Sequence, residues 1–187
     1  PAQTCTVLEL SPEDATVCTL AATDEDFDDV RGRGQTLTYS IFSGNDGGAF
    51  ELFADKVSNT AEVVVREPLS FEAQSSYTLT VRIKDDGIIN NNLVSSTFTD
   101  VAVTIAVIDE NEPPTIDPQS RAVDENSAVG VLVGTKLVAS DPDTAWAPLL
   151  AFSIVSGADG AFVITSDGQL SVAGPLDFEA QATYQLV

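Results

Sequence analysis

The stretch Ile108-Asp109-Glu110-Asn111-Glu112-Pro113-Pro114 follows the apolar run 101–107 and decides how the chain is organised. It places three carboxylates and an amide within four residues, and two prolines follow. Proline fixes φ and lacks a backbone donor, so no strand or helix passes through the pair. Neighbouring carboxylates repel one another, whereas Ca²⁺ binds about six to eight oxygens from carboxylates, amides and carbonyls. The stretch predicts a stiff connector that binds a hard cation; the alternative is a solvated acidic turn.

The composition excludes several classes of function. The 187 residues include 8 Lys and Arg against 29 Asp and Glu, a formal charge of -21. Such a polyanion does not bind nucleic acid or an anionic membrane by electrostatics, and an apolar fraction of 43% argues against disorder. The absence of histidine excludes zinc sites and His-based nucleophile pairs. Adjacent carboxylates such as Asp28 and Asp29 point apart, which is unsuited to glycoside hydrolysis, so we predict that the protein is not an enzyme.

Two cysteines, Cys5 and Cys18, flank Ser11-Pro12, which is a candidate centre of a hairpin. In such a hairpin they would lie nearly opposite each other, and a disulfide would contribute roughly 3 kcal/mol. Two buried thiols are the alternative. No apolar run approaches the roughly 20 residues of a membrane span.

Short β-branched and apolar runs separated by turn residues recur along residues 1–108. The run Tyr77–Ile83 alternates with period two, as a half-buried strand does. No segment combines a helical period with helix caps. We therefore predict an all-β fold, an antiparallel sandwich of about seven strands. The runs lie at 6–10, 16–21, 37–41, 49–52, 60–65, 77–83 and 99–107.

Beyond the prolines the same order of signals returns. Leu150–Gly157 matches Leu37–Gly44, and Gly160-Ala161-Phe162 matches Gly48-Ala49-Phe50. A repeat of about 110 residues is the size of a whole domain. We predict a first repeat at 1–108, a calcium-binding linker at 109–114 and a second repeat at 115–187. The second copy stops within the strand that matches Tyr77–Ile83, so we expect the chain to be a segment of a longer protein.

The order of the acidic motifs resembles that of extracellular cadherin repeats. The order is Glu, then Asp-x-Asp, Leu-(Asp)-x-Glu, a lone Asp, and Asp-x-Asn-(Asp/Glu) with prolines. These five motifs follow in sequence, three of them twice, over nearly the whole chain. In that family calcium ions lie between consecutive seven-stranded Greek-key sandwiches. The resemblance implies two tandem Greek-key antiparallel β-sandwiches joined by a calcium-binding linker, outside the cell or at its surface.

The resemblance also implies a ligand set between the repeats. Alternate residues of an extended Asp-x-Asp segment face the same way, so both carboxylates can reach one ion cluster. Glu13 competes with Glu9 for the first position but lies only eleven residues before Asp24. The ligand set is Glu9, Glu72, Asp109, Glu110, Asn111, Glu112, Pro113, Asp141 and Asp143, in which Glu110 and Pro113 offer carbonyls. Half-sites toward neighbouring repeats would use Asp24, Asp26 and Asp85 in the first repeat, and Glu125, Asp177 and Glu179 in the second.

Three departures from the family pattern affect the number of ions. Ser70 stands where the family has Asp, so the outer ion loses a carboxylate. Glu112 replaces Asp, and Pro113 replaces Asn in a linker that is one residue shorter. The third ion would use an Asp matching Asp85, which would lie beyond Val187. We therefore expect two Ca²⁺ ions at the linker, and a third only conditionally.

These features predict a calcium-rigidified spacer or adhesion module within a longer multi-repeat protein. Neighbouring repeats are its expected partners, together with a homophilic or heterophilic protein partner, without nucleic acid or membrane contact by this segment. Adhesive members of the family exchange a Trp near the mature N-terminus. The single Trp, Trp146, lies in the second repeat and cannot take that part. The alternatives are a structural subunit of an extracellular filament and a calcium-dependent glycan-binding module.

Overall fold

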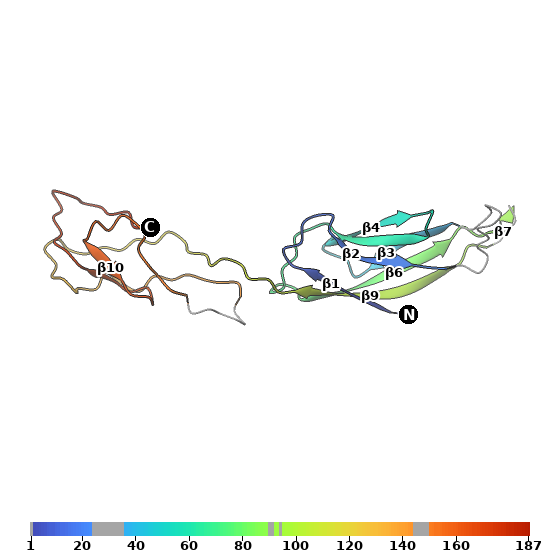
Figure 1. Cartoon of the computed structure of the whole chain (residues 1–187), viewed down its shortest axis with the longest axis horizontal. Helices are drawn as coiled ribbons and strands as arrows, with labels where there is room; N and C mark the ends of the chain where they lie inside the picture. Colours follow the sequence, from blue (N-terminus) through green and yellow to red (C-terminus); the bar gives the residue numbers. More distant parts are fainter. Residues whose placement is uncertain (1, 24–35, 90–91, 94, 144–149) are drawn as a thin grey trace. The chain divides into compact units, whose positions relative to one another are not determined.

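The computed structural model describes residues 2–23, 36–89, 92–93, 95–143 and 150–187 (Figure 1). The chain divides into two compact units, Pro1–Glu110 and Asn111–Val187, and the predicted linker 109–114 spans this division. All regular structure over the described ranges is β-strand, which confirms the predicted fold class. Nothing in those ranges forms a helix of the length and apolarity that a membrane crossing requires.

The described part of unit 1 forms two main sheets and one small hairpin. The first sheet has the order β1-β9-β6-β3 and the second has the order β2-β5-β4. The hairpin pairs β7 (Ile88–Ile89) with β8 (Asn92–Leu93) in an antiparallel arrangement. The strands of the two main sheets are β1 (Gln3–Leu8), β2 (Thr16–Ala21), β3 (Leu37–Ser43), β4 (Phe50–Asp55), β5 (Thr60–Val65), β6 (Ser76–Asp85) and β9 (Phe98–Ile108).

The core of unit 1 lies between its two sheets. Successive side chains of a strand point to opposite faces, so every second residue of β6 and β9 is inward. Leu79, Val81 and Ile105 are completely buried there against Val63 of the opposite sheet. This confirms the period-two prediction for the Tyr77–Ile83 run. Because a one-residue slip would turn the whole apolar set outward, the core also fixes strand register.

The expected hairpin around Ser11-Pro12 is wrong. β1 and β2 belong to different sheets, and β1 pairs with β9 in parallel, with Val7 opposite Val107. The predicted all-antiparallel pairing is therefore also wrong for this pair. The chain leaves β1 through a turn at Leu8–Ser11 and reaches the other sheet at Asp14, whose φ is +66°. Pairing with the long strand β9 satisfies more backbone groups than a tight hairpin around a proline would.

The predicted disulfide between Cys5 and Cys18 is present. Its Cα atoms are 6.0 Å apart, and it joins β1 of one sheet to β2 of the other. Cys5 is buried in the core and Cys18 packs against the core from the opposite side. The cross-link therefore runs through the sandwich rather than along one hairpin.

Unit 2 has fewer strands than unit 1 over its described residues. β10 (Phe162–Ile164) pairs with β11 (Leu170–Val172), and two isolated bridges add Thr115–Ser140 and Leu132–Ser171. In unit 1 the strand β9 pairs with both β1 and β6, and the described part of 111–187 contains no counterpart of it. Within the described residues, the segments of unit 2 that correspond to β1 and β6 therefore lack the strand with which β1 and β6 form hydrogen bonds in unit 1.

Equivalent positions of the two units nevertheless have the same geometry. Gly44 and Gly157 both have a φ of +85°, which an L side chain rarely adopts. A Cβ would lie 2.0 Å from the Thr78 carbonyl oxygen in unit 1 and 1.8 Å from that of Gln185 in unit 2. An edge-to-face ring pair also recurs, with centroids 5.0 Å apart in both units. The internal repeat predicted from sequence is therefore present in the packing.

Candidate metal centre

Glu9 organises the acidic end of unit 1. It follows β1 directly, and its side chain continues the inward alternation of Cys5 and Val7, so it is only 2% exposed. Glu9 Oε1 accepts a hydrogen bond of 2.7 Å from the Glu110 amide, and Oε2 accepts one of 2.8 Å from the Phe71 amide. One buried carboxylate therefore ties together three segments that are distant in sequence.

These segments carry the other acidic residues of the predicted site. Glu72 follows Phe71, and Asp109 precedes Glu110. Glu9, Glu72 and Asp109 each offer a carboxylate oxygen, and the three oxygens lie within 4.8 Å of one another. Three carboxylates at such distances repel, and an oxygen-preferring cation relieves that repulsion. Among the described residues of unit 1, these three form the group with the geometry to hold a metal ion.

The competing assignment of Glu13 is disfavoured. Glu13 lies in an ion pair of 2.7 Å with Arg66, which also contacts Asp14 and Glu51. This places Glu13 in a solvent-exposed charge network rather than in the group around Glu9. The alternation of β1 in the sequence already favoured Glu9 over Glu13, because residues 5, 7 and 9 face the same way.

Ser70 preserves the local turn without supplying the expected charge. Its Oγ accepts a hydrogen bond of 3.1 Å from the Ala73 amide and donates one of 3.1 Å to Glu72 Oε2. In unit 2 the equivalent Asp177 Oδ1 accepts a 3.0 Å hydrogen bond from the Ala180 amide. Serine and aspartate therefore both accept a hydrogen bond from the backbone amide three residues later. Only aspartate would add a carboxylate to the site.

The first residues of unit 2 are held by the Asp-x-Asp motif. The Glu112 amide donates to Asp143 Oδ2 at 2.9 Å, and the Asp143 amide donates to Asp141 Oδ1 at 3.0 Å. Asp143 is buried, with 5% of its surface exposed. The Asn111 side-chain amide donates to the Glu112 carbonyl at 3.2 Å. These hydrogen bonds therefore bring the acidic pair and the chain at Glu112 together within unit 2.

The two residues expected to offer backbone carbonyls have different surroundings. The Glu110 side chain accepts a hydrogen bond of 3.3 Å from the Leu10 amide, so it braces the turn after β1. Pro113 is exposed and is followed by Pro114 and the Thr115–Ser140 bridge of unit 2. A carbonyl role for either residue stays a prediction.

One half-site expected toward a neighbouring repeat is assembled in unit 2. Glu125, Asp177 and Glu179 have carboxylate oxygens within 4.8 Å of one another, and all three side chains are exposed. Glu125 Oε2 accepts a hydrogen bond of 3.1 Å from the Phe178 amide. This repeats the bond from Phe71 to the buried acid of unit 1.

The other half-site is described only through Asp85. Its carboxylate accepts hydrogen bonds of 2.8 Å from the amides of Gly87 and Thr97, besides the Thr97 hydroxyl. The hydroxyl bond is the main reason why the pKa of Asp85 lies below its usual range. Asp24 and Asp26 lie outside the described residues, as does Trp146.

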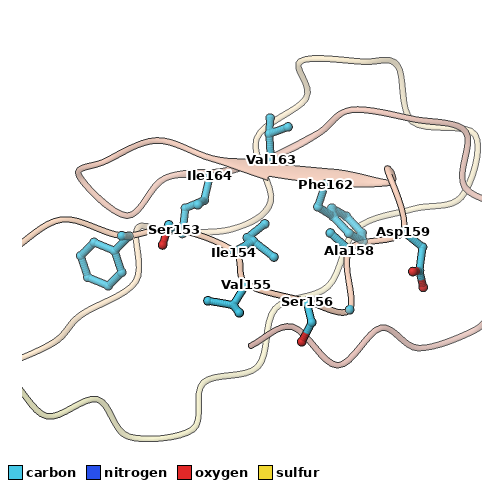
Figure 2. A pocket seen from close by; sticks show the side chains of 11 residues that line it. Ser153, Ile154, Val155, Ser156, Ala158, Asp159, Phe162, Val163 and Ile164 are labelled. Carbon is cyan, nitrogen blue, oxygen red and sulfur yellow. The ribbon is translucent and has the colours of Figure 1, made fainter.

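A hollow of about 570 Å³ lies on unit 2 between residues 152–159 and β10. Figure 2 shows Ile154 and Phe162 among its lining side chains, with Asp159 at one end. Asp159 is the single ionisable group among the described residues that line it. A hollow whose described lining holds one acid has no second group for acid–base chemistry and no group of metal ligands.

Sequence reasoning identified the acids but missed the groups that position them. The Phe71 amide and the Thr97 hydroxyl carry no recognisable spacing signal. Their roles depend on contacts between segments far apart in the chain, such as the 62 residues that separate Glu9 from Phe71.

Comparison with known proteins places this geometry in a family. The family model described as "Cadherin domain" matches residues 3–108 and 119–187. Human Cadherin-24 is 34% identical over 186 residues, which cover 96% of the chain but 22% of that protein. Mouse Protocadherin Fat 2 is 33% identical over 188 residues, which cover 98% of the chain but 4% of that protein. The chain therefore spans less than a quarter of the length of these relatives.

Solved structures give the same result for the fold. Three repeats of mouse Cadherin-23 (EC22-24) align with a TM-score of 0.62 and 27% identity, over 96% of this chain and 53% of theirs. Three repeats of mouse Protocadherin-24 (EC1-3) align with a TM-score of 0.63 and 25% identity, over 95% and 56%. Proteins of this family are adhesion proteins of the cell surface rather than enzymes, and their domains generally bind calcium. The chain, with both of its repeats matched, belongs to the cadherin domain family.

Proposed function

We propose that this chain is a calcium-rigidified extracellular spacer or adhesion module within a longer multi-repeat protein. Calcium binds where the first repeat passes into the second. The observation that carries the proposal is the assembly of Glu9, Glu72 and Asp109 at the end of unit 1 that leads into unit 2. The buried Glu9 carboxylate holds the backbone beside both partner acids, so the group is organised before any ion arrives.

The chemistry of the donor set fits calcium. The proposed ligands are carboxylates, one amide and backbone carbonyls, which are hard oxygen donors. Sulfur and imidazole donors, which favour zinc and copper, do not contribute, because the sequence has no histidine and its two cysteines form a disulfide. A bound dication also compensates part of the formal charge of -21.

The proposed ligands from unit 2 are the linker residues Asn111 and Glu112 together with Asp141 and Asp143. Asp109 and Glu112 are only three residues apart, so at most about 11 Å of extended chain separates their Cα atoms. The chain between them is therefore short enough for an ion bound by Asp109 to take ligands from unit 2 as well. Ions that take ligands from both repeats would restrict rotation about the linker.

Two ions at this linker is the number that the residues favour. Ser70 supplies a hydroxyl that is already bonded to Glu72 where the family pattern has a further carboxylate. Ligand charge is one of the factors that set calcium affinity, so the outer site is the weaker one. A third ion would need a carboxylate matching Asp85 in the second repeat.

The test is small-angle X-ray scattering of the whole chain with calcium and with chelator. Calcium in the millimolar range saturates extracellular modules, whose dissociation constants are roughly 10⁻⁴–10⁻³ M. We expect a narrow distribution of maximum dimensions with calcium and a broad one after chelation. Magnesium at the same concentration controls for charge screening and should leave the distribution broad. Identical distributions with calcium and with chelator would contradict the proposal.

A further inference from the structure

The disulfide Cys5–Cys18 closes the loop that contains Glu9. The two cysteines are 13 residues apart in sequence, and Glu9 lies four residues after the first of them. Cys5 faces the core from β1, and Cys18 packs against it from β2 in the opposite sheet. The cross-link therefore anchors both ends of the segment from which the buried carboxylate projects.

Apart from the disulfide, the strand that leads into Glu9 is held by hydrogen bonds and core packing. In the described sheet β1 lies at the edge, with β9 as its neighbour, and spans six residues. An edge strand with one ladder opens more readily than a central strand does. Beyond β1, the Glu9 amide donates to the Ile108 carbonyl at 3.1 Å, and the Asp14 amide donates to the Val65 carbonyl at 2.8 Å. The disulfide is the covalent restraint in this set.

Displacement of β1 would disturb more than one ligand. Cys5, Val7 and Glu9 lie on the same face of the strand, so a shift at Cys5 moves the Glu9 carboxylate with it. That carboxylate accepts the amides of Phe71 and Glu110, which adjoin the other two acids of the group. A loosened β1 therefore loosens all three carboxylates.

We propose that the Cys5–Cys18 disulfide is a positioning element for the calcium site, because it holds Glu9 where its carboxylate organises the backbone beside Glu72 and Asp109. This inference rests on the proposed function, since it assigns the cross-link a role in binding the same ions. Groups that orient metal ligands from outside the coordination shell typically change metal affinity by about 10–100-fold. The disulfide acts through the strand, and we expect its removal to weaken calcium binding about 5–10-fold.

The test compares calcium titrations of the intact chain and of the double variant Cys5→Ala, Cys18→Ala by isothermal calorimetry. A purely structural disulfide would lower the melting temperature in chelator and leave the dissociation constant for calcium unchanged. A positioning disulfide raises that constant as well. The intact chain treated with a phosphine reductant under native conditions provides a second comparison, which does not require the variant to fold without its cross-link.

Val81→Ala is the matched control, because it truncates a fully buried core residue of β6 and leaves the β1–β2 cross-link intact. It should lower the melting temperature while keeping the calcium affinity of the intact chain. Equal calcium affinities for the intact and cross-link-free chains would overturn the inference and leave the proposed function standing. Equal weakening in the control would also overturn it. An intact chain that binds no calcium would remove the proposed function itself.

Discussion

Replacing Glu72 by glutamine separates two effects of the acidic group: the charge repulsion that destabilises the calcium-free protein, and the binding of calcium. Glu72 is exposed, and its carboxylate accepts a hydrogen bond from the Ser70 hydroxyl. The glutamine oxygen can still accept that bond, so the turn should persist. The substitution then removes one negative charge from the group with Glu9 and Asp109. We expect opposite effects on stability in chelator and on calcium binding.

The gain in stability of the calcium-free variant follows from the distances between the carboxylate oxygens. Oxygens within 4.8 Å repel by about 0.9 kcal/mol per pair in water, and physiological salt reduces this to about 0.5 kcal/mol. Two pairs involve Glu72, so Glu72→Gln should stabilise the calcium-free protein by about 1 kcal/mol. For a domain of this size the melting temperature should rise by roughly 4–8 °C.

The loss with calcium follows from ligand charge. Removing one of three carboxylates should raise the dissociation constant about tenfold, for example from about 10⁻⁴ to about 10⁻³ M. At about 10 mM calcium, binding stabilises the original chain by about 2.7 kcal/mol and the variant by about 1.4 kcal/mol. The calcium-induced rise in melting temperature should therefore fall by about half.

Differential scanning calorimetry in chelator and in calcium measures both quantities on the whole chain. Glu67→Gln is the matched control, because it removes an exposed charge from the same segment without touching the acidic group. It should leave the calcium-induced rise unchanged. An unaltered rise in Glu72→Gln, or a variant less stable than the original chain in chelator, would refute the reasoning.

Two further predictions concern the scaffold. Gly44→Ala should destabilise unit 1 by about 2–4 kcal/mol in urea unfolding, because its Cβ would lie 2.0 Å from the Thr78 carbonyl oxygen. Gly48→Ala, with a φ of +71° but open space around its Cβ, should cost only about 1 kcal/mol, and equal costs would contradict the steric account. In unit 2, the Lys136 ammonium is the main reason why the pKa of Asp167 is about 2, followed by the hydroxyl of a nearby threonine. Because this folded-state pKa is depressed, its stabilising contribution is present above about pH 4 and is lost as the pH falls toward 2. Lys136→Gln should raise the pKa of Asp167 in an NMR titration of its carboxyl carbon, and an unchanged value would show that the ion pair is not the cause.

Local patterns in the chain were sufficient for the fold class, the repeat and the acidic motifs. Alternation with period two depends on which side chains face the core, so Tyr77–Ile83 is recognisable as a strand without its neighbours. The matching of Leu37–Gly44 with Leu150–Gly157 likewise compares short segments, and both contain a glycine at a φ of +85°. The order of the acidic motifs identified the residues that now form the group around Glu9.

Contacts between distant segments were not predictable in this way. The chain carries no local signal that β1 pairs in parallel with β9 about 100 residues away, and the expected hairpin was wrong for that reason. The free energies of competing strand pairings depend on the whole core, which short-range patterns do not contain. The same limit applies to the disulfide, which was expected along a hairpin and instead joins two sheets.

The sequence thus determines that the protein is a tandem of two all-β repeats with acidic motifs in a fixed order, because composition, alternation and motif order are properties of the chain alone. The tertiary structure decides that Glu9 is buried and that its two oxygens hold the backbone beside Glu72 and Asp109. Burying a carboxylate is unfavourable unless hydrogen bonds compensate it. Those bonds come from residues 62 and 101 positions away, which only the folded sandwich brings to Glu9.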